Sequence, residues 1–168
     1  MLYLELARIY ESLEKTTKRL EKTKILSEFF KKISKKEARY IAYLAKGKVF
    51  PDWNESEIGI SSQLAIKSIS KATGASDHEL VKKWRSIGDL GKVAEETIKT
   101  KKQRTLFSAK LRTEKVVDNL IKAAALVGPG TVDRKVSLVA ELLTISEPIE
   151  ARYIIRTLLE RNGTSVPY

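Results

Sequence analysis

Two short glycine-containing segments each precede a predicted helix and lie near basic side chains. They are Gly59-Ile60-Ser61-Ser62, followed by Lys67, and Gly128-Pro129-Gly130-Thr131, followed by Arg134 and Lys135. The first turn of a helix exposes backbone N–H groups at the positive end of the helix dipole, so such a segment can hold a phosphate. Gly47-Lys48 is a third loop in which a cation adjoins a glycine. The 128–131 segment alone fits a simple helix–helix loop equally well.

The sequence contains no residue combination typical of a catalytic or metal site. It has no cysteine and a single histidine, which excludes a cysteine nucleophile, a thiolate zinc site and a histidine metal cluster. It also has no Gly-rich P-loop and no lysine in the K-x-D-G context used for nucleotidyl transfer. We therefore predict no catalytic residue, no metal and no cofactor in this chain.

The charge balance favours a polyanionic partner. The 168 residues carry 32 Lys+Arg against 21 Asp+Glu, a formal net charge of +11. Nucleic acid is the commonest such partner and an anionic membrane surface is the second, while a charge that serves solubility alone is the alternative that stays open. Basic residues concentrate in 15–36 and 99–115. No apolar run is long enough to span a bilayer, and the N-terminus is not typical of a signal peptide, so we expect a cytoplasmic protein.

One basic loop contains an apolar pair. Gln103 stands shortly before Leu106 and Phe107, inside the second basic run. If the pair is exposed, the segment is a short peptide that docks into a groove of a partner. The alternative is that Leu106 and Phe107 fold back onto the core.

The hydrophobic periodicity is helical almost throughout, and no alternating strand pattern is convincing. The expected helices cover about 2–13, 25–33, 34–45, 61–72, 76–86, 89–100, 113–127, 132–143 and 147–159. Capping boxes at Ser34/Glu37 and Ser76/Glu79 mark two of the helix starts. We predict a single all-α globular domain over residues 1–160, with 161–168 as a tail or the start of a linker.

A five-residue sequence occurs twice. Glu37-Ala38-Arg39-Tyr40-Ile41 recurs as Glu150-Ala151-Arg152-Tyr153-Ile154, and an apolar helix precedes each copy at the same distance. This repetition favours a duplicated helical pair and an internal pseudo-two-fold repeat. Such a domain could present equivalent helix ends to the two strands of a duplex.

From about Leu2 to Leu159 the chain resembles the N-terminal DNA-binding domain of archaeal and eukaryotic-type ATP-dependent DNA ligases. The order and spacing of several segments carry the resemblance. These segments are 47–53, 57–60, 88–91, 103–107, 128–135 and 150–154. One departure follows Leu159, where Glu160 stands in place of the family's usual glycine and the arginine of the next DNA loop is displaced.

The resemblance implies an all-helical domain that binds the minor groove of nicked duplex DNA through phosphates, in replication, repair and recombination. The catalytic domains, with the adenylated lysine and the ATP and Mg²⁺ sites, would lie outside this chain. It also implies that Gln103, Leu106 and Phe107 dock on the sliding clamp.

We expect a monomeric, nucleoid-associated domain whose partners are nicked double-stranded DNA, the sliding clamp and the ligase catalytic domains. The predicted DNA contacts are Lys48, Ser61, Ser62, Lys67, Gly128, Gly130, Thr131, Arg134, Lys135, Arg152 and Arg156. Two alternatives stay open: an adaptor whose main activity is clamp binding, and an RNA-binding helical module.

Overall fold

The computed structural model describes residues 1–45, 48–51, 58–100 and 109–159, and this part of the chain folds into nine α-helices. They are α1 (Tyr3–Glu14), α2 (Arg19–Phe30), α3 (Lys35–Ala45), α4 (Ser62–Thr73), α5 (Asp77–Ile87), α6 (Leu90–Lys99), α7 (Thr113–Ala125), α8 (Val132–Ile145) and α9 (Pro148–Leu158). The prediction of an all-α single domain is confirmed. Within the described residues, the β-type pairing is one isolated bridge between Leu2 and Arg112.

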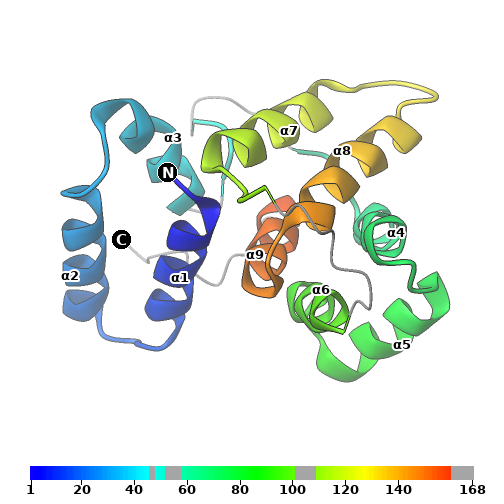
Figure 1. Ribbon diagram of the computed structural model, residues 1–168, viewed down its shortest axis with the longest axis horizontal. Coiled ribbons are helices and arrows are strands. Elements are labelled where there is room, and N and C mark those ends of the chain that lie inside the picture. The colour runs from blue at the N-terminus through cyan, green and yellow to red at the C-terminus, as the bar shows by residue number, and fades with distance from the viewer. Residues whose placement is uncertain (46–47, 52–57, 101–108, 160–168) are drawn as a thin grey trace.

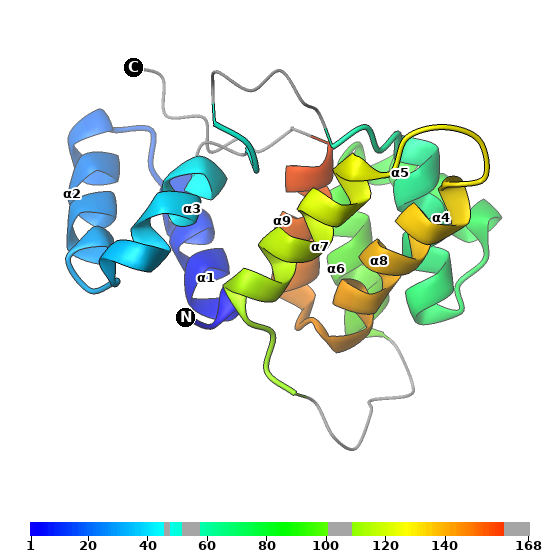
Figure 2. The same cartoon turned by 90° about the horizontal axis from the view of Figure 1, so that it is seen from above.

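The helix α9 runs through the middle of the molecule. Helices α1, α2 and α3 lie at one end, and α4 and α5 lie at the other (Figures 1 and 2). Helix α9 packs on α6 and on α1, and seven of its eleven residues are buried, so both ends of the domain rest on it. The Tyr153 ring lies 5.0 Å from that of Tyr10 on α1 and belongs to the same hydrophobic core.

Local sequence signals set most helix ends. The capping boxes at Ser34/Glu37 and Ser76/Glu79 are both formed. Gly88 ends α5 with a φ of 77°, a conformation in which a side chain would be strained. Helix α2 begins at Arg19, earlier than its apolar stripe indicates, and Lys18 supplies no side-chain cap that could have revealed this start.

The duplicated pentapeptide occupies two different environments. Tyr153 is fully buried and Arg152 is largely covered, whereas Arg39 is exposed at the edge of the molecule. The structure does not confirm the internal pseudo-repeat.

Helices α6 and α9 approach each other closely at Gly91. A Cβ atom there would lie 2.7 Å from the carbonyl oxygen of Arg152 and 2.8 Å from Cγ of Arg156, both closer than packed atoms allow. The missing side chain of Gly91 therefore sets the spacing of the two helices.

One carboxyl group is buried in the first turn of α9. Glu150 is 2 % exposed, and its Oε2 accepts a hydrogen bond of 2.7 Å from the backbone N–H of Glu147. Burial raises the pKa of Glu150 from 4.5 to about 7, and the charge of Glu147 adds to the effect. The N–H groups of Glu147 and Leu4 oppose this rise without cancelling it.

Replacing Gly91 by alanine should lower the free energy of unfolding by about 1 to 3 kcal/mol, because the new methyl group overpacks the α6–α9 contact. Urea denaturation measures the change. Lys92→Ala, on the exposed face one residue further along, is the control and should change stability by less than about 0.5 kcal/mol. An unchanged midpoint for Gly91→Ala would show that the helices separate without cost.

The stability of the domain should depend on the protonation of Glu150. Its folded-state pKa lies above the ordinary value, so the folded protein binds this proton more tightly, and the free energy of unfolding falls as the pH rises from about 4.5 to about 7. The free energy of unfolding of Glu150→Gln, measured relative to that of the parent protein, should therefore be roughly 2 kcal/mol higher at pH 8 than at pH 5. Denaturation at both pH values measures it, with exposed Glu96→Gln as the control. Equal differences at the two pH values would contradict this assignment.

Candidate nucleic-acid interface

The structure brings the two glycine-containing segments together. Helices α4 and α8, which follow these segments, pack against each other at one end of the molecule (Figure 1). The Lys135 side chain on α8 reaches the turn before α4 and donates a hydrogen bond of 3.4 Å to the carbonyl oxygen of Gly59. On the same pair of helices, Lys71 Nζ donates to Ser137 Oγ at 2.8 Å. The start of α8 thus lies beside α4, and Lys135 joins it to the turn before α4. We use the name α4–α8 surface for Gly59, Ser61, Lys67, Gly128, Gly130, Arg134 and Lys135.

Alternating burial exposes the polar atoms of the turn before α4. Ile58 and Ile60 are buried in the core, whereas Gly59 between them is exposed and has a φ of 62°. Ser61 then caps α4, its Oγ accepting a hydrogen bond from the N–H of Leu64 at 3.3 Å. The two isoleucines fix the turn while Gly59 and Ser61 face outward.

The turn before α8 leaves the start of that helix uncapped. Gly128 and Gly130 have φ values of 98° and 78°, and a Cβ at either position would meet no neighbouring atom, so glycine is needed there for backbone conformation alone. The Thr131 hydroxyl donates to the carbonyl oxygen of Gly128 at 2.8 Å and forms no cap with α8. The first N–H groups of α8 are therefore available to an anion.

The cations around the two turns are accessible. Lys67 on α4 and Arg134 on α8 are exposed, and neither forms an ion pair within the described part of the chain. Lys48 is also exposed, but it follows α3, which lies at the end of the molecule opposite α4, so the structure does not bring it together with the two turns. Asp133 is the acidic residue in the first turn of α8. Around Lys67 and Arg134 the surface combines free backbone donors with positive charge that no described carboxylate neutralises, a combination that suits phosphate groups.

The sequence matches the family described as DNA ligase N terminus over residues 2–165. The chain belongs to this family. It is 40% identical over 166 residues to the DNA ligase of Thermococcus fumicolans and 41% identical over 160 residues to that of Methanothermobacter thermautotrophicus. These alignments cover 99% and 95% of this chain but only 30% and 29% of the two ligases. The chain therefore spans under a third of the length of these relatives.

Two predicted DNA contacts of this ligase N-terminal domain lie in intramolecular ion pairs. Arg152 donates through Nε and Nη2 to Glu95 on α6, each at 2.6 Å. Arg156 donates to Asp89 through Nε at 3.1 Å and also binds Glu14 on α1. The two side chains are only 15% and 11% exposed. Their contact with DNA stays a prediction, and the proposal below does not depend on it.

These ion pairs shift the pKa of their members. Burial acts to raise the pKa of Asp89, but the hydrogen bonds and charge of Arg156 outweigh it and hold that pKa below its ordinary value. Burial acts to lower the pKa of both arginines, and their carboxylate partners outweigh it, so both values are raised. The pairs therefore stay charged and bind α9 to α6 and α1.

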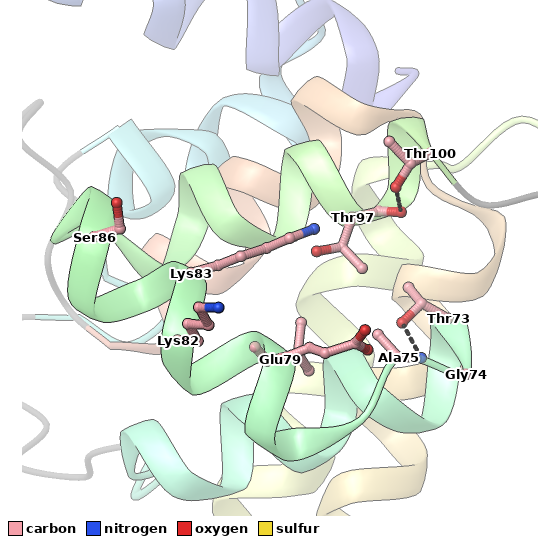
Figure 3. A pocket seen from close by; sticks show the side chains of 10 residues that line it. Thr73, Gly74, Ala75, Glu79, Lys82, Lys83, Ser86, Thr97 and Thr100 are labelled. Carbon is pink, nitrogen blue, oxygen red and sulfur yellow. Dashed lines mark hydrogen bonds between the residues drawn. The ribbon is translucent and has the colours of Figure 1, made fainter.

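A hollow of about 1040 Å³ opens at the other end of α4, between α5 and α6 (Figure 3). Lys83 extends toward Thr97 across it, and Lys82 lines the same side. The Glu79 carboxylate is used in the capping box with Ser76. These lysines offer basic side chains remote from the two glycine turns.

Several predicted site residues lie outside the described residues. They are the clamp-binding group Gln103, Leu106 and Phe107, the glycine at 47, and Glu160. Among the residues that are described, no group of three or more His, Cys, Asp or Glu side chains could hold a metal ion. None of their helices has the length and apolar character needed to cross a membrane.

Proposed function

We propose that this chain is the sequence-nonspecific double-stranded DNA-binding domain of an ATP-dependent DNA ligase. The observation that carries this proposal is the α4–α8 surface, where Lys135 in the first turn of α8 reaches the turn before α4. The membership of the chain in the DNA ligase N terminus family supports it. A net charge of +11 provides long-range attraction to the duplex.

The binding mechanism is the holding of phosphates. The first N–H groups of α8 point toward one phosphate, and Arg134 and Lys135 neutralise its charge or that of its neighbour. At α4, Ser61 Oγ accepts from the helix backbone, which leaves its hydrogen free to donate to a phosphate oxygen. These contacts carry no base readout, so binding is independent of sequence.

The chain would position a nick for chemistry performed elsewhere. In this proposal the domain holds the duplex across its minor groove while catalytic domains outside the chain close around the break. The adenylated lysine, ATP and Mg²⁺ belong to those domains. Gln103, Leu106 and Phe107 would dock the assembly on a sliding clamp by filling an apolar groove.

The distribution of aromatic side chains favours duplex DNA over single-stranded RNA. Binding of unpaired bases uses exposed aromatic rings as stacking platforms. Among the described residues, the exposed large hydrophobic side chains are Leu20, Ile121, Val127 and Val132, all aliphatic. In the described part of the chain, the RNA-binding alternative therefore has no fully exposed Phe, Tyr or Trp ring on which a base could stack.

Reversing Arg134 and Lys135 to glutamate should weaken duplex binding at least tenfold and make the salt dependence shallower. If about five phosphates are neutralised, log K falls with log salt at a slope near −4 to −5, and the double variant should lose about 2 of this slope. Fluorescence anisotropy with two unrelated nicked duplexes measures both quantities.

Lys82→Glu/Lys83→Glu makes the same charge change on the α5–α6 hollow and should bind within about twofold of the parent, because phosphate contacts act at short range. A loss confined to one DNA sequence, or an equal loss in this control, would contradict phosphate holding by the α4–α8 surface.

Phe107→Ala should abolish clamp binding and leave duplex binding unchanged, because it empties the apolar pocket without altering charge. Surface plasmon resonance with immobilised clamp measures the first quantity, and anisotropy with nicked duplex measures the second. Retained clamp binding would remove the docking segment from the proposal. Strong clamp binding by a parent protein that does not bind duplex would favour the adaptor alternative.

A further inference from the structure

Most of the net positive charge lies away from the α4–α8 surface. Residues 15–39 contain ten lysines and arginines against three glutamates, a net +7 of the chain's +11. These residues form α2, its flanking turns and the first part of α3. They lie at the end of the molecule opposite α4 (Figures 1 and 2). The DNA surface proposed above does not use this charge.

Five of these cations cluster where α2 ends and α3 begins. We call this cluster the α2–α3 corner; it consists of Lys31, Lys32, Lys35, Lys36 and Arg39. All five are exposed, and none forms an ion pair within the described residues. The corner therefore holds five exposed cations within nine residues of the chain.

The neighbouring acids offset the corner only in part. Glu28 lies one helical turn before Lys31 and Lys32 and is exposed, and it forms no ion pair within the described residues. Glu37 is already engaged by the ammonium group of Met1 at 2.5 Å and by Ser34, which together lower its pKa to about 2. Glu21 pairs with Lys18 at the far end of α2, at 3.0 Å. Glu11, near the end of α1, pairs with Lys15 at 3.3 Å.

The cluster is unfavourable for the isolated domain. Lys35 and Arg39 lie four residues apart on α3, where like charges repel each other, and Lys31 and Lys32 add further positive charge just before this helix. A ligand that supplies several closely spaced negative charges would remove this repulsion. Duplex DNA presents one phosphate charge about every 1.7 Å of its axis.

The large apolar side chains next to the corner are mainly covered, so the corner offers little of the apolar surface that protein partners or membranes engage. Phe29 is buried, and Phe30 and Ile33 pack against the core. Protein interfaces are depleted in lysine and depend on buried aromatic anchors, and amphipathic membrane binding requires an exposed apolar face. The chemistry of the corner therefore favours a phosphate backbone.

We propose that the α2–α3 corner is a second contact for duplex DNA, separate from the α4–α8 surface. This inference rests on the proposed function. The two surfaces lie at opposite ends of the domain, so a duplex must run along the domain to touch both (Figure 1). The corner then lengthens the footprint and adds affinity only when the duplex is long enough.

The test is binding as a function of duplex length. Lys31→Glu/Lys35→Glu/Lys36→Glu is compared with the parent on nicked duplexes of about 12 to about 40 base pairs, which rise about 3.4 Å per pair. On the longest duplex we expect at least a tenfold loss of affinity and a salt slope shallower by about 3. On the shortest we expect affinity within about twofold of the parent.

A matched control separates the corner from general charge. Lys82→Glu/Arg85→Glu/Lys92→Glu makes the same charge change at exposed positions of α5 and α6 and should bind as the parent does at every length. Circular dichroism verifies that both triple variants are folded. The variant Lys31→Gln/Lys35→Gln/Lys36→Gln should show the same dependence on duplex length, with a smaller loss of affinity.

The possible failures are distinguishable. Parent-like affinity of the corner variant at all lengths overturns the inference, while a loss for Arg134→Glu/Lys135→Glu in the same assay still supports the proposed function. If the corner variant loses as much affinity on the shortest duplex as on the longest, or if the control variant loses as much as the corner variant, the claim of a second contact is overturned. Loss of binding to anionic vesicles or to a poly-glutamate peptide with duplex binding intact also overturns it. A parent protein that binds no duplex overturns the proposed function itself.

Discussion

The contact between α6 and α9 is the constraint on which the rest of the domain depends. Gly91 lets the two helix backbones approach within a distance that any side chain would prevent. Arg152 and Arg156 then bind α9 to Glu95 and Asp89 on the α6 side, and Arg156 extends the link to Glu14 on α1. Separating these helices would leave largely buried charges without their partners, which is unfavourable. The ion pairs therefore also help to determine which helices pack together. Helix α9 can thus support α1–α3 on one side and α4–α6 on the other.

The α4–α8 surface depends on contacts behind it. Helix α8 is held to α4 by Lys71 and Lys135, and to α7 by Asn119, whose amide donates to Leu138 and Glu141. These polar contacts join side chains from three helices, which keeps the start of α8 at a set place relative to the turn before α4. The positions of the exposed donors and cations are therefore set by the packing of α4, α7 and α8.

The sequence predicted the helices well because their ends are local. Capping boxes at Ser34 and Ser76 and the glycine after α5 act within a few residues, so a one-dimensional pattern contains them. The pairing of Arg152 with Glu95 and of Lys135 with Gly59 joins residues 57 and 76 positions apart, which no local pattern contains. For the same reason the repeated pentapeptide predicted equivalence, whereas tertiary packing gave its two copies different surroundings. The clamp-binding prediction falls outside the described residues and stays a prediction.

The hydrogen bond from Lys135 to Gly59 has a mechanical consequence. Because it joins the first turn of α8 to the turn before α4, it keeps the two helix starts near each other without help from a partner. A binding surface that is already ordered loses little conformational entropy when it binds a partner. In the proposed function the DNA would then make most of the adjustment, and a nicked duplex, which bends more easily than an intact one, should adjust more readily.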